Sequence, residues 1–148
     1  MIIIADGGST KCDWILLNDN GEVELKTRTK GLNPAVFKPE TLKSRIEENE
    51  DLKKIISKVT RVDFFGAGCG TPTPVKNLEL ILKDFFKDAE INVEEDMVAA
   101  ALAATTEPGI VCILGTGSNS CFFDGKKVHM EIESLGYVLM DEASGNYF

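Results

Sequence analysis

Glycine-rich segments follow two short apolar runs of the sequence, and both segments could bind an anion. Residues 6–11 read Asp-Gly-Gly-Ser-Thr-Lys, and residues 115–119 read Gly-Thr-Gly-Ser-Asn. Glycine lets backbone N–H groups approach an oxyanion closely, and the neighbouring hydroxyl and amine groups add further donors. Both segments therefore indicate phosphate binding.

A second apolar run and a tight-turn signal follow each glycine loop, so the unit of strand, loop, strand and turn occurs twice. Two such loops facing each other would hold the phosphates of a nucleotide. Neither loop has the form of a Walker A or Rossmann loop, because a strand rather than a helix follows. For residues 6–11, the alternative is a hairpin turn whose glycines serve the backbone conformation alone.

Asp96 is the candidate for acid–base chemistry. It directly precedes an alanine-rich segment, residues 97–105, that predicts a helix. Phosphoryl transfer needs a base that accepts the proton of the attacking hydroxyl, and a carboxylate at a helix N-terminus stays ionised and oriented. A role as the helix N-cap is equally natural and compatible with catalysis. The preceding Glu94 and Glu95 are expected to face solvent.

Composition limits the classes of function. The chain has 148 residues, of which 43% are hydrophobic, enough for one compact domain or one domain plus part of another. The formal net charge of −8 argues against a nucleic-acid partner, which requires a basic surface. The apolar runs are too short for a membrane span, and the N-terminus lacks the basic start of a signal peptide. We expect a cytoplasmic protein without a membrane partner.

The cysteines argue against a zinc site. They stand at positions 12, 69, 112 and 121, without C-x-x-C spacing, and the single histidine is His129. Cys12, Cys112 and Cys121 fall in or beside predicted strands. We expect them to be small buried side chains in a reducing compartment.

Hydrophobic patterning predicts an α/β lobe with a mixed sheet, in the order βββαβαβα. The expected strands are 2–6, 12–18, 22–29, 62–65 and 90–93, and the expected helices are 39–59, 74–86 and 97–105. The first strand is apolar throughout and is expected to be buried on both faces. Thr73 is the expected N-cap of the second helix, and the glycines at 66, 68 and 70 are expected to shape a strand-end loop.

A second set of strands follows Pro108-Gly109, at 110–114, 120–124 and 127–133. We expect one lobe at residues 1–108 and the opening β-meander of a second, incomplete lobe at 109–148. Three strands with one uncovered face make a poor free-standing structure. The natural protein is therefore expected to continue, or this segment to dock on the first lobe or on another chain.

Five motifs in this order resemble the actin-like ATPase superfamily, which includes sugar kinases and Hsp70-type ATPases. They are residues 5–11, residues 31–34 (Gly-Leu-Asn-Pro), Asp96 with its alanine-rich helix, residues 114–119, and residues 141–145 (Asp-Glu-Ala-Ser-Gly). Within that superfamily the chain is most similar to the N-acetylglucosamine kinase group with the BadF/BadG/BcrA/BcrD-type ATPases. The resemblance implies a ribonuclease H-like, actin-like ATPase lobe.

The resemblance implies an enzyme that phosphorylates a sugar with ATP and Mg²⁺, the sugar being N-acetylglucosamine or a related amino sugar. Asp96 would be the general base, and Asp6 would hold the metal through water. The implied nucleotide-binding residues are Gly7, Gly8, Ser9, Thr10, Lys11, Gly115, Thr116, Gly117 and Ser118. The implied substrate-binding residues are Asn33, Asn119, Gly136 and Asp141. A homodimer is compatible with this assignment.

Alternatives stay open at this point. Asn33 could be a plain turn asparagine. The chain could be an ATPase activator of a 2-hydroxyacyl-CoA dehydratase, with Cys112 and Cys121 at an iron–sulfur cluster, although their spacing is not a cluster signature. It could also be an inactive nucleotide-binding fragment.

Overall fold

The computed structural model describes residues 1–115, 117–130 and 144–145. By their internal contacts the residues form two compact units, Met1–Asp96 and Met97–Phe148. The lobe boundary at Pro108-Gly109 stays a prediction, because compactness within this chain does not define the lobes of a complete protein. Among the described residues, no helix has the length and apolar character needed to cross a membrane.

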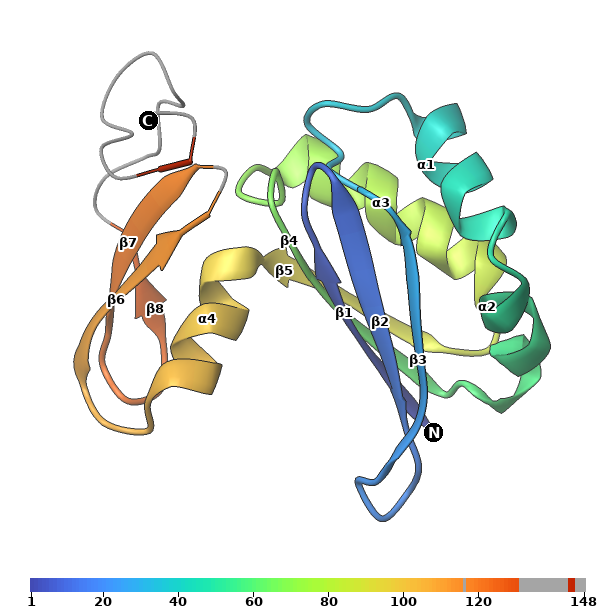
Figure 1. Ribbon diagram of the computed structural model, residues 1–148, viewed down its shortest axis with the longest axis horizontal. Coiled ribbons are helices and arrows are strands. Elements are labelled where there is room, and N and C mark those ends of the chain that lie inside the picture. The colour runs from blue at the N-terminus through green and yellow to red at the C-terminus, as the bar shows by residue number, and fades with distance from the viewer. Residues whose placement is uncertain (116, 131–143, 146–148) are drawn as a thin grey trace. The chain divides into compact units, whose positions relative to one another are not determined.

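The first unit is built on a mixed sheet with the strand order β3-β2-β1-β4-β5 (Figure 1). Its strands are β1 (Ile2–Gly7), β2 (Lys11–Leu17), β3 (Val23–Lys30), β4 (Arg61–Gly66) and β5 (Glu90–Glu95). The first three strands form an antiparallel meander, whereas β1, β4 and β5 run parallel. The predicted element order and the mixed sheet are confirmed.

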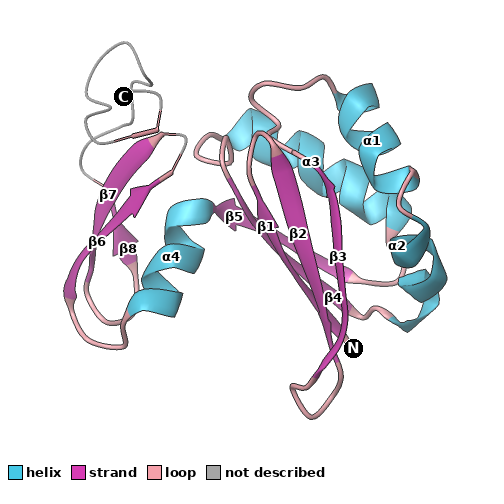
Figure 2. Ribbon diagram, in the orientation of Figure 1, coloured by secondary structure: helices cyan, strands magenta, loops and turns pink. Residues whose placement is uncertain are grey.

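Helices cover one face of this sheet (Figure 2). They are α1 (Pro39–Glu47), α2 (Glu50–Ile55), the 3-10 turn η1 (Ile56–Lys58) and α3 (Pro72–Phe85). Burial in β1 alternates accordingly, since Ile3 and Ala5 are buried while Ile2 and Ile4 are each 38% exposed. The prediction that β1 is buried on both faces is wrong, because a continuous apolar run does not reveal which face the helices cover.

The expected single helix at residues 39–59 is also wrong, because Asn49 interrupts it. Asn49 adopts an extended conformation, and its side chain accepts a hydrogen bond from the Leu52 backbone N–H, which caps α2. Its amide also donates to the Thr27 hydroxyl and to the Arg28 carbonyl, each at 3.0 Å. The amphipathic pattern continues across this break, so periodicity alone does not show it.

Helix α3 begins two residues before the predicted start. Thr71 is the N-cap residue and Pro72 is among the first helical residues, instead of Thr73 and Pro74. The segment 71–74 repeats the Thr-Pro pair, and either pair satisfies the same start signal. The predicted apolar stripe of α3 is confirmed, with Leu78 and Leu82 fully buried.

The core of the first unit is centred on Trp14 and Phe64. Their rings pack edge to face with centroids 6.1 Å apart. The indole N–H of Trp14 donates to the Thr29 hydroxyl at 3.1 Å, so the only polar atom of this side chain is satisfied inside the core. The Phe64 ring lies directly beneath Gly7 and Gly66, at the end of the sheet that carries the first glycine loop.

The second unit contains most of α4 (Asp96–Ala104) and a three-stranded antiparallel sheet, β6 (Gly109–Leu114), β7 (Ser118–Phe123) and β8 (Val128–His129). The predicted return of a three-stranded meander is confirmed. Met97 and Ala101 of α4 form a small core with Val111, Cys121 and Phe123.

Asn49→Ala should destabilise the first unit by about 1–2 kcal/mol, because α2 loses its cap and two further hydrogen bonds. Urea unfolding followed by the fluorescence of Trp14 measures this change. Asn77→Ala is the control, since Asn77 is an exposed residue inside α3, and it should change stability by less than about 0.5 kcal/mol. Equal effects of the two substitutions would contradict the role of Asn49.

Candidate functional site

The carboxyl ends of the parallel strands meet at one edge of the first unit's sheet. Gly7 of β1, Gly66 of β4 and Glu95 of β5 are in register there. The first glycine loop, the loop 67–70 and Asp96 directly follow these residues. Ligands of α/β sheets bind outside the carboxyl ends of the strands. The structure thus brings three of the predicted motifs to the edge where a site is expected.

Hydrogen bonds to its carbonyl oxygens hold the first glycine loop in place. The Gly8 N–H donates to the Lys11 carbonyl at 2.8 Å, which closes the turn. The Gly8 carbonyl accepts from the Leu32 N–H at 3.0 Å, the Thr10 carbonyl from the Gly31 N–H at 2.9 Å, and the Gly7 carbonyl from the Ala67 N–H at 2.8 Å. The loop is therefore fixed from two sides, while Ser9 and Thr10 stay exposed.

Glycine is needed here for close approach rather than for an unusual backbone. Among the described glycines, a positive φ occurs at Gly21, Gly68 and Gly125, none of which is in the first loop. A Cβ at Gly7 would lie 2.3 Å from the tip of the Phe64 ring, and a Cβ at Gly31 would lie 2.0 Å from the Ser9 carbonyl oxygen. The alternative of a purely structural hairpin stays open, because these close approaches are to the protein's own core and backbone.

Asn33 connects the first loop to the loop 67–70. It is only 7% exposed; its amide donates to the Ser9 hydroxyl at 2.9 Å, and its carbonyl oxygen accepts from the Ala35 N–H at 2.9 Å. Gly68 has a φ of 82°, and a Cβ there would lie 2.0 Å from the same Asn33 oxygen. Asn33 thus orients the Ser9 hydroxyl, and its expected contact with a sugar stays a prediction.

Charged side chains flank the first loop. Lys11 forms an ion pair with Asp13 at 2.9 Å, and Arg28 pairs with the same carboxylate. Hydrogen bonds from Arg28 and then Lys11 hold the pKa of Asp13 below its ordinary value. Asp6, on the neighbouring strand opposite Asp13, is exposed. The side chain of Lys11 is therefore already oriented beside the loop by a carboxylate.

No group of three or more His, Cys, Asp or Glu side chains suited to a metal occurs among residues 1–115, 117–130 and 144–145. This finding is compatible with the expectation for Asp6. Magnesium in phosphoryl-transfer sites keeps several waters and uses one or two carboxylates together with the substrate phosphates.

The two carboxylates at the end of β5 differ in their surroundings. Glu94 accepts a hydrogen bond from the Asn92 amide at 2.9 Å. Glu95 is half-buried, and burial followed by the negative charge of Asp96 raises its pKa. The expectation that Glu95 faces solvent is wrong, because the loop 67–70 folds over this end of the strand: a Cβ at Gly70 would lie 3.0 Å from a Glu95 carboxylate oxygen.

Asp96 is partly buried. It is the first residue of α4, which begins one residue earlier than the predicted helix at 97–105. Cys69 is buried in the adjacent loop. Its burial, followed by the negative charges of Asp96 and Glu95, raises the pKa of the Cys69 thiol to about 12. Two carboxylates and a thiol therefore lie close together at the carboxyl edge. The proposed catalytic role of Asp96 stays a prediction.

The second glycine loop lies in the second unit. The Gly115 N–H donates to the Gly117 carbonyl at 3.0 Å, and the Gly115 carbonyl accepts from the Gly145 N–H at 2.7 Å. Ser118 and Asn119 begin β7. Thr116, Gly136 and Asp141 lie outside the described residues. The phosphate contacts expected of this loop, and its expected position opposite the first loop, stay predictions.

The cysteines of the second unit lie on opposite faces of its sheet. Cys121 is buried, whereas Cys112 is exposed, so the expectation that Cys112 is buried is wrong. In the register of β6 and β7, Val111 opposes Cys121 and Cys112 opposes Ser120, which places the two sulfur atoms on different sides. This geometry does not let the two residues of one chain hold the same iron–sulfur cluster.

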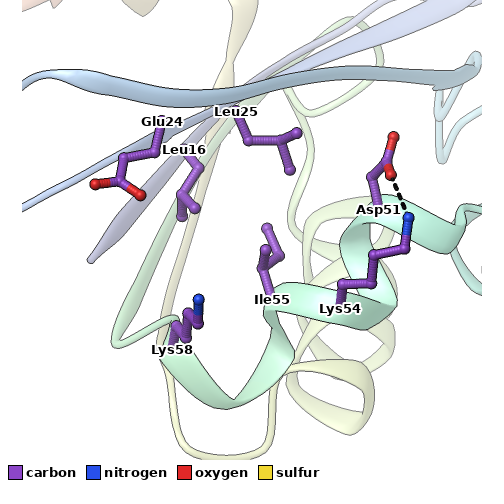
Figure 3. Close-up of a pocket in the computed structure, with 7 residues that line it drawn as sticks. All are labelled: Leu16, Glu24, Leu25, Asp51, Lys54, Ile55 and Lys58. Carbon is purple, nitrogen blue, oxygen red and sulfur yellow. Dashed lines mark hydrogen bonds and ion pairs between the residues drawn. The ribbon is translucent and has the colours of Figure 1, made fainter.

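A separate hollow of about 220 Å³ lies at the opposite end of the first sheet (Figure 3). Leu16 and Leu25 line it from the strands and Ile55 from α2, and an ion pair of 2.9 Å between Asp51 and Lys54 borders it. None of the predicted site residues lines this hollow.

Comparison with models of protein families gives no match, and comparison with curated proteins gives none. Solved structures do match. A proposed N-acetylglucosamine kinase from Porphyromonas gingivalis superposes with a TM-score of 0.88 at 39% sequence identity, over 98% of this chain and 52% of that chain. The chain has the actin-like ATPase fold. The predicted fold class is therefore confirmed, including a mixed-sheet lobe followed by a further meander.

More distant structures share this fold. A proposed N-acetylmannosamine kinase from Listeria monocytogenes matches with a TM-score of 0.60 and 15% identity, over 92% of this chain and 52% of that chain. A ROK family glucokinase from Streptomyces griseus, in complex with glucose and AMPPNP, matches with a TM-score of 0.59 and 18% identity, over 86% of this chain and 46% of that chain. These three neighbours are described as sugar kinases, and the chain spans about half of the length of each.

Sequence reasoning misses Gly31 and Glu95 as contributors to the site. Gly31 is part of a quoted motif, but its close approach to Ser9 joins the residue after β3 to the loop between β1 and β2, and this approach has no local signal in the sequence. Glu95 has a signal, since it stands between a predicted strand and the candidate base, but its burial depends on the position of Gly70.

Gly31→Ala should destabilise the first unit by about 3 kcal/mol, because the new methyl group meets the backbone of the glycine loop. Gly70→Ala is the matched control, since its methyl group meets only the movable end of Glu95, and it should cost less than about 1 kcal/mol. Urea midpoints measure both effects. Equal stabilities of the two variants would contradict the close approach at Gly31.

Alkylation by iodoacetamide at pH 8 should modify Cys112 first. Burial raises the pKa of the Cys12 and Cys69 thiols, so both stay protonated at this pH, and the thiolate is the reactive form. Peptide mass spectrometry locates the labelled residues, and all four cysteines should react in urea. Labelling of Cys69 as fast as Cys112 in the folded chain would contradict this order.

Proposed function

We propose that the chain supplies the phosphate-binding loops and the catalytic base of an ATP-dependent sugar kinase, whose acceptor is N-acetylglucosamine or a related amino sugar. One observation carries this proposal: a fixed glycine loop and Asp96 follow in-register ends of parallel strands at the same edge of a sheet. The actin-like ATPase fold and the kinase neighbours support the reaction class.

The first loop fits the binding of β- and γ-phosphate oxygens. Its carbonyl groups are held by Leu32, Gly31 and Ala67, and the exposed hydroxyls of Ser9 and Thr10 are left to face a ligand. Donors that are fixed before the ligand arrives stabilise developing charge without reorganisation. Lys11 adds a positive charge beside them.

Magnesium would supply charge neutralisation between the phosphates. Asp6 would hold it through water, since this carboxylate is exposed at the end of β1 next to the loop. In the second loop, Gly117 would contribute a backbone N–H and Ser118 its hydroxyl. Gly115, whose N–H is donated to the Gly117 carbonyl, would let the phosphates approach closely.

Asp96 would accept the proton of the attacking sugar hydroxyl. Most of the remaining catalysis in phosphoryl transfer comes from positioning and electrostatics. The position at the start of α4 keeps the Asp96 carboxylate ionised, because the helix dipole favours negative charge there.

The choice of an amino sugar depends on the relative with 39% identity, a proposed N-acetylglucosamine kinase. Asn33 would contact the sugar through the second N–H of its amide, the first being donated to Ser9. Such a contact would couple sugar binding to the orientation of the phosphate loop.

Asp96→Asn should lower turnover by about 10²–10⁴-fold and leave nucleotide affinity nearly unchanged. A coupled ADP-release assay across a panel of amino and neutral sugars measures turnover, and calorimetry with ATP and Mg²⁺ measures affinity. Both are best done on the longest natural protein that contains this chain. The control is Asp88→Asn, which removes the same charge from an exposed loop.

Turnover that survives in the Asp96→Asn variant would remove Asp96 from the mechanism. Absence of ADP release with every sugar, together with absence of ATP binding, would overturn the kinase proposal and favour an inactive fragment.

A further inference from the structure

Glu95 occupies a defined place at the candidate site. It is the last residue of β5, and it opposes Gly66 of the parallel neighbour β4. Its carboxylate lies against Gly70, where a Cβ would come within 3.0 Å of one carboxylate oxygen and 3.3 Å of the carboxyl carbon. The absence of a side chain at Gly70 therefore makes room for this carboxylate at the carboxyl edge.

Glu95 directly precedes Asp96, and both side chains are only partly exposed. Two carboxylates that share a half-buried place disfavour each other's ionised form, and the interaction acts equally on both partners. The pKa of Glu95 is raised by burial and then by Asp96, and Cys69 experiences both charges. These groups therefore form one electrostatic cluster.

We propose that Glu95 is a positioning residue of the site: partly buried beside Gly70, its carboxylate is a negative neighbour that makes Asp96 a stronger base. The catalytic meaning of this assignment rests on the proposed kinase function, whereas the interaction between the carboxylates does not. In a kinase, a stronger base would take the proton of the sugar hydroxyl more readily once both carboxylates are ionised.

The elements around Glu95 provide few other charges. The loop provides Cys69, α4 provides Asp96, and β4 provides Gly66, which has no side chain. Helix α3 packs along β5, and its Lys83 donates to the Ala89 carbonyl, which precedes β5. Among the described groups, Asp96 is the charge that shifts the pKa of Glu95.

The experiment is a carboxyl-carbon NMR titration of Asp96 in the 148-residue chain, as wild type and as Glu95→Gln. Loss of the negative neighbour should lower the titration midpoint of Asp96 by about 0.5–1 pH unit at low salt, and by less at 0.5 M salt. Glu95→Asp keeps the charge and should restore most of the wild-type midpoint.

Glu94→Gln is the matched control. It removes the same charge one residue earlier, on the other face of β5, where the Glu94 carboxylate accepts a hydrogen bond from the Asn92 amide. It should move the Asp96 midpoint by less than about 0.2 pH unit. Equal Asp96 midpoints in the two glutamine variants, or a Glu95→Gln midpoint unchanged from wild type, would overturn the proposal.

A second readout links this interaction to catalysis. In the active protein, Glu95→Gln should move the acidic limb of the kcat/KM profile to lower pH by the same 0.5–1 unit, about 3–10-fold in proton concentration, and reduce the plateau. An acidic limb that stays in place despite a shifted Asp96 midpoint would overturn the positioning role. A wild-type protein without turnover would overturn the kinase function, and the titration would still decide the interaction.

Discussion

The arrangement of the site depends on close packing around one buried ring. Phe64 lies two residues before the end of β4, and its ring contacts the glycines at the strand ends, Gly7 on β1 and Gly66 on β4. The ring occupies the space that a Cβ at either position would need. This contact lets the first glycine loop lie directly on the core, so a loop of small residues is held as rigidly as the sheet beneath it.

Starting from this contact with Phe64, a chain of further contacts holds the other parts of the site. Gly31 and Leu32 bind the far side of the loop, Asn33 joins Ser9 to the segment beneath Gly68, and Gly70 covers Glu95 beside Asp96. Each link depends on a backbone or amide hydrogen bond or on the missing side chain of a glycine. The first glycine loop and the end of β5 that precedes Asp96 are thus held in one frame by these contacts.

Sequence patterns predict the parts of this structure that depend on local periodicity. The order of strands and helices follows from apolar spacing, and the glycine loops follow from their composition. The helix break at Asn49 cannot be predicted from periodicity, because the amphipathic pattern continues through it. The burial of one face of β1 depends on which side of the sheet the helices cover. The burial of Glu95 and the contact of Gly31 with Ser9 are tertiary effects, which no spacing along the chain encodes.

Trp14 is the only tryptophan of the chain, and it belongs to the first unit. Indole emission, excited at wavelengths that tyrosine does not absorb, therefore reports on the first unit alone, at the layer beneath the glycine loop. Circular dichroism, by contrast, sums over both compact units. A melt in which ellipticity falls before the indole emission shifts to the red would reveal separate cooperative units within one chain, without a label or a mutation.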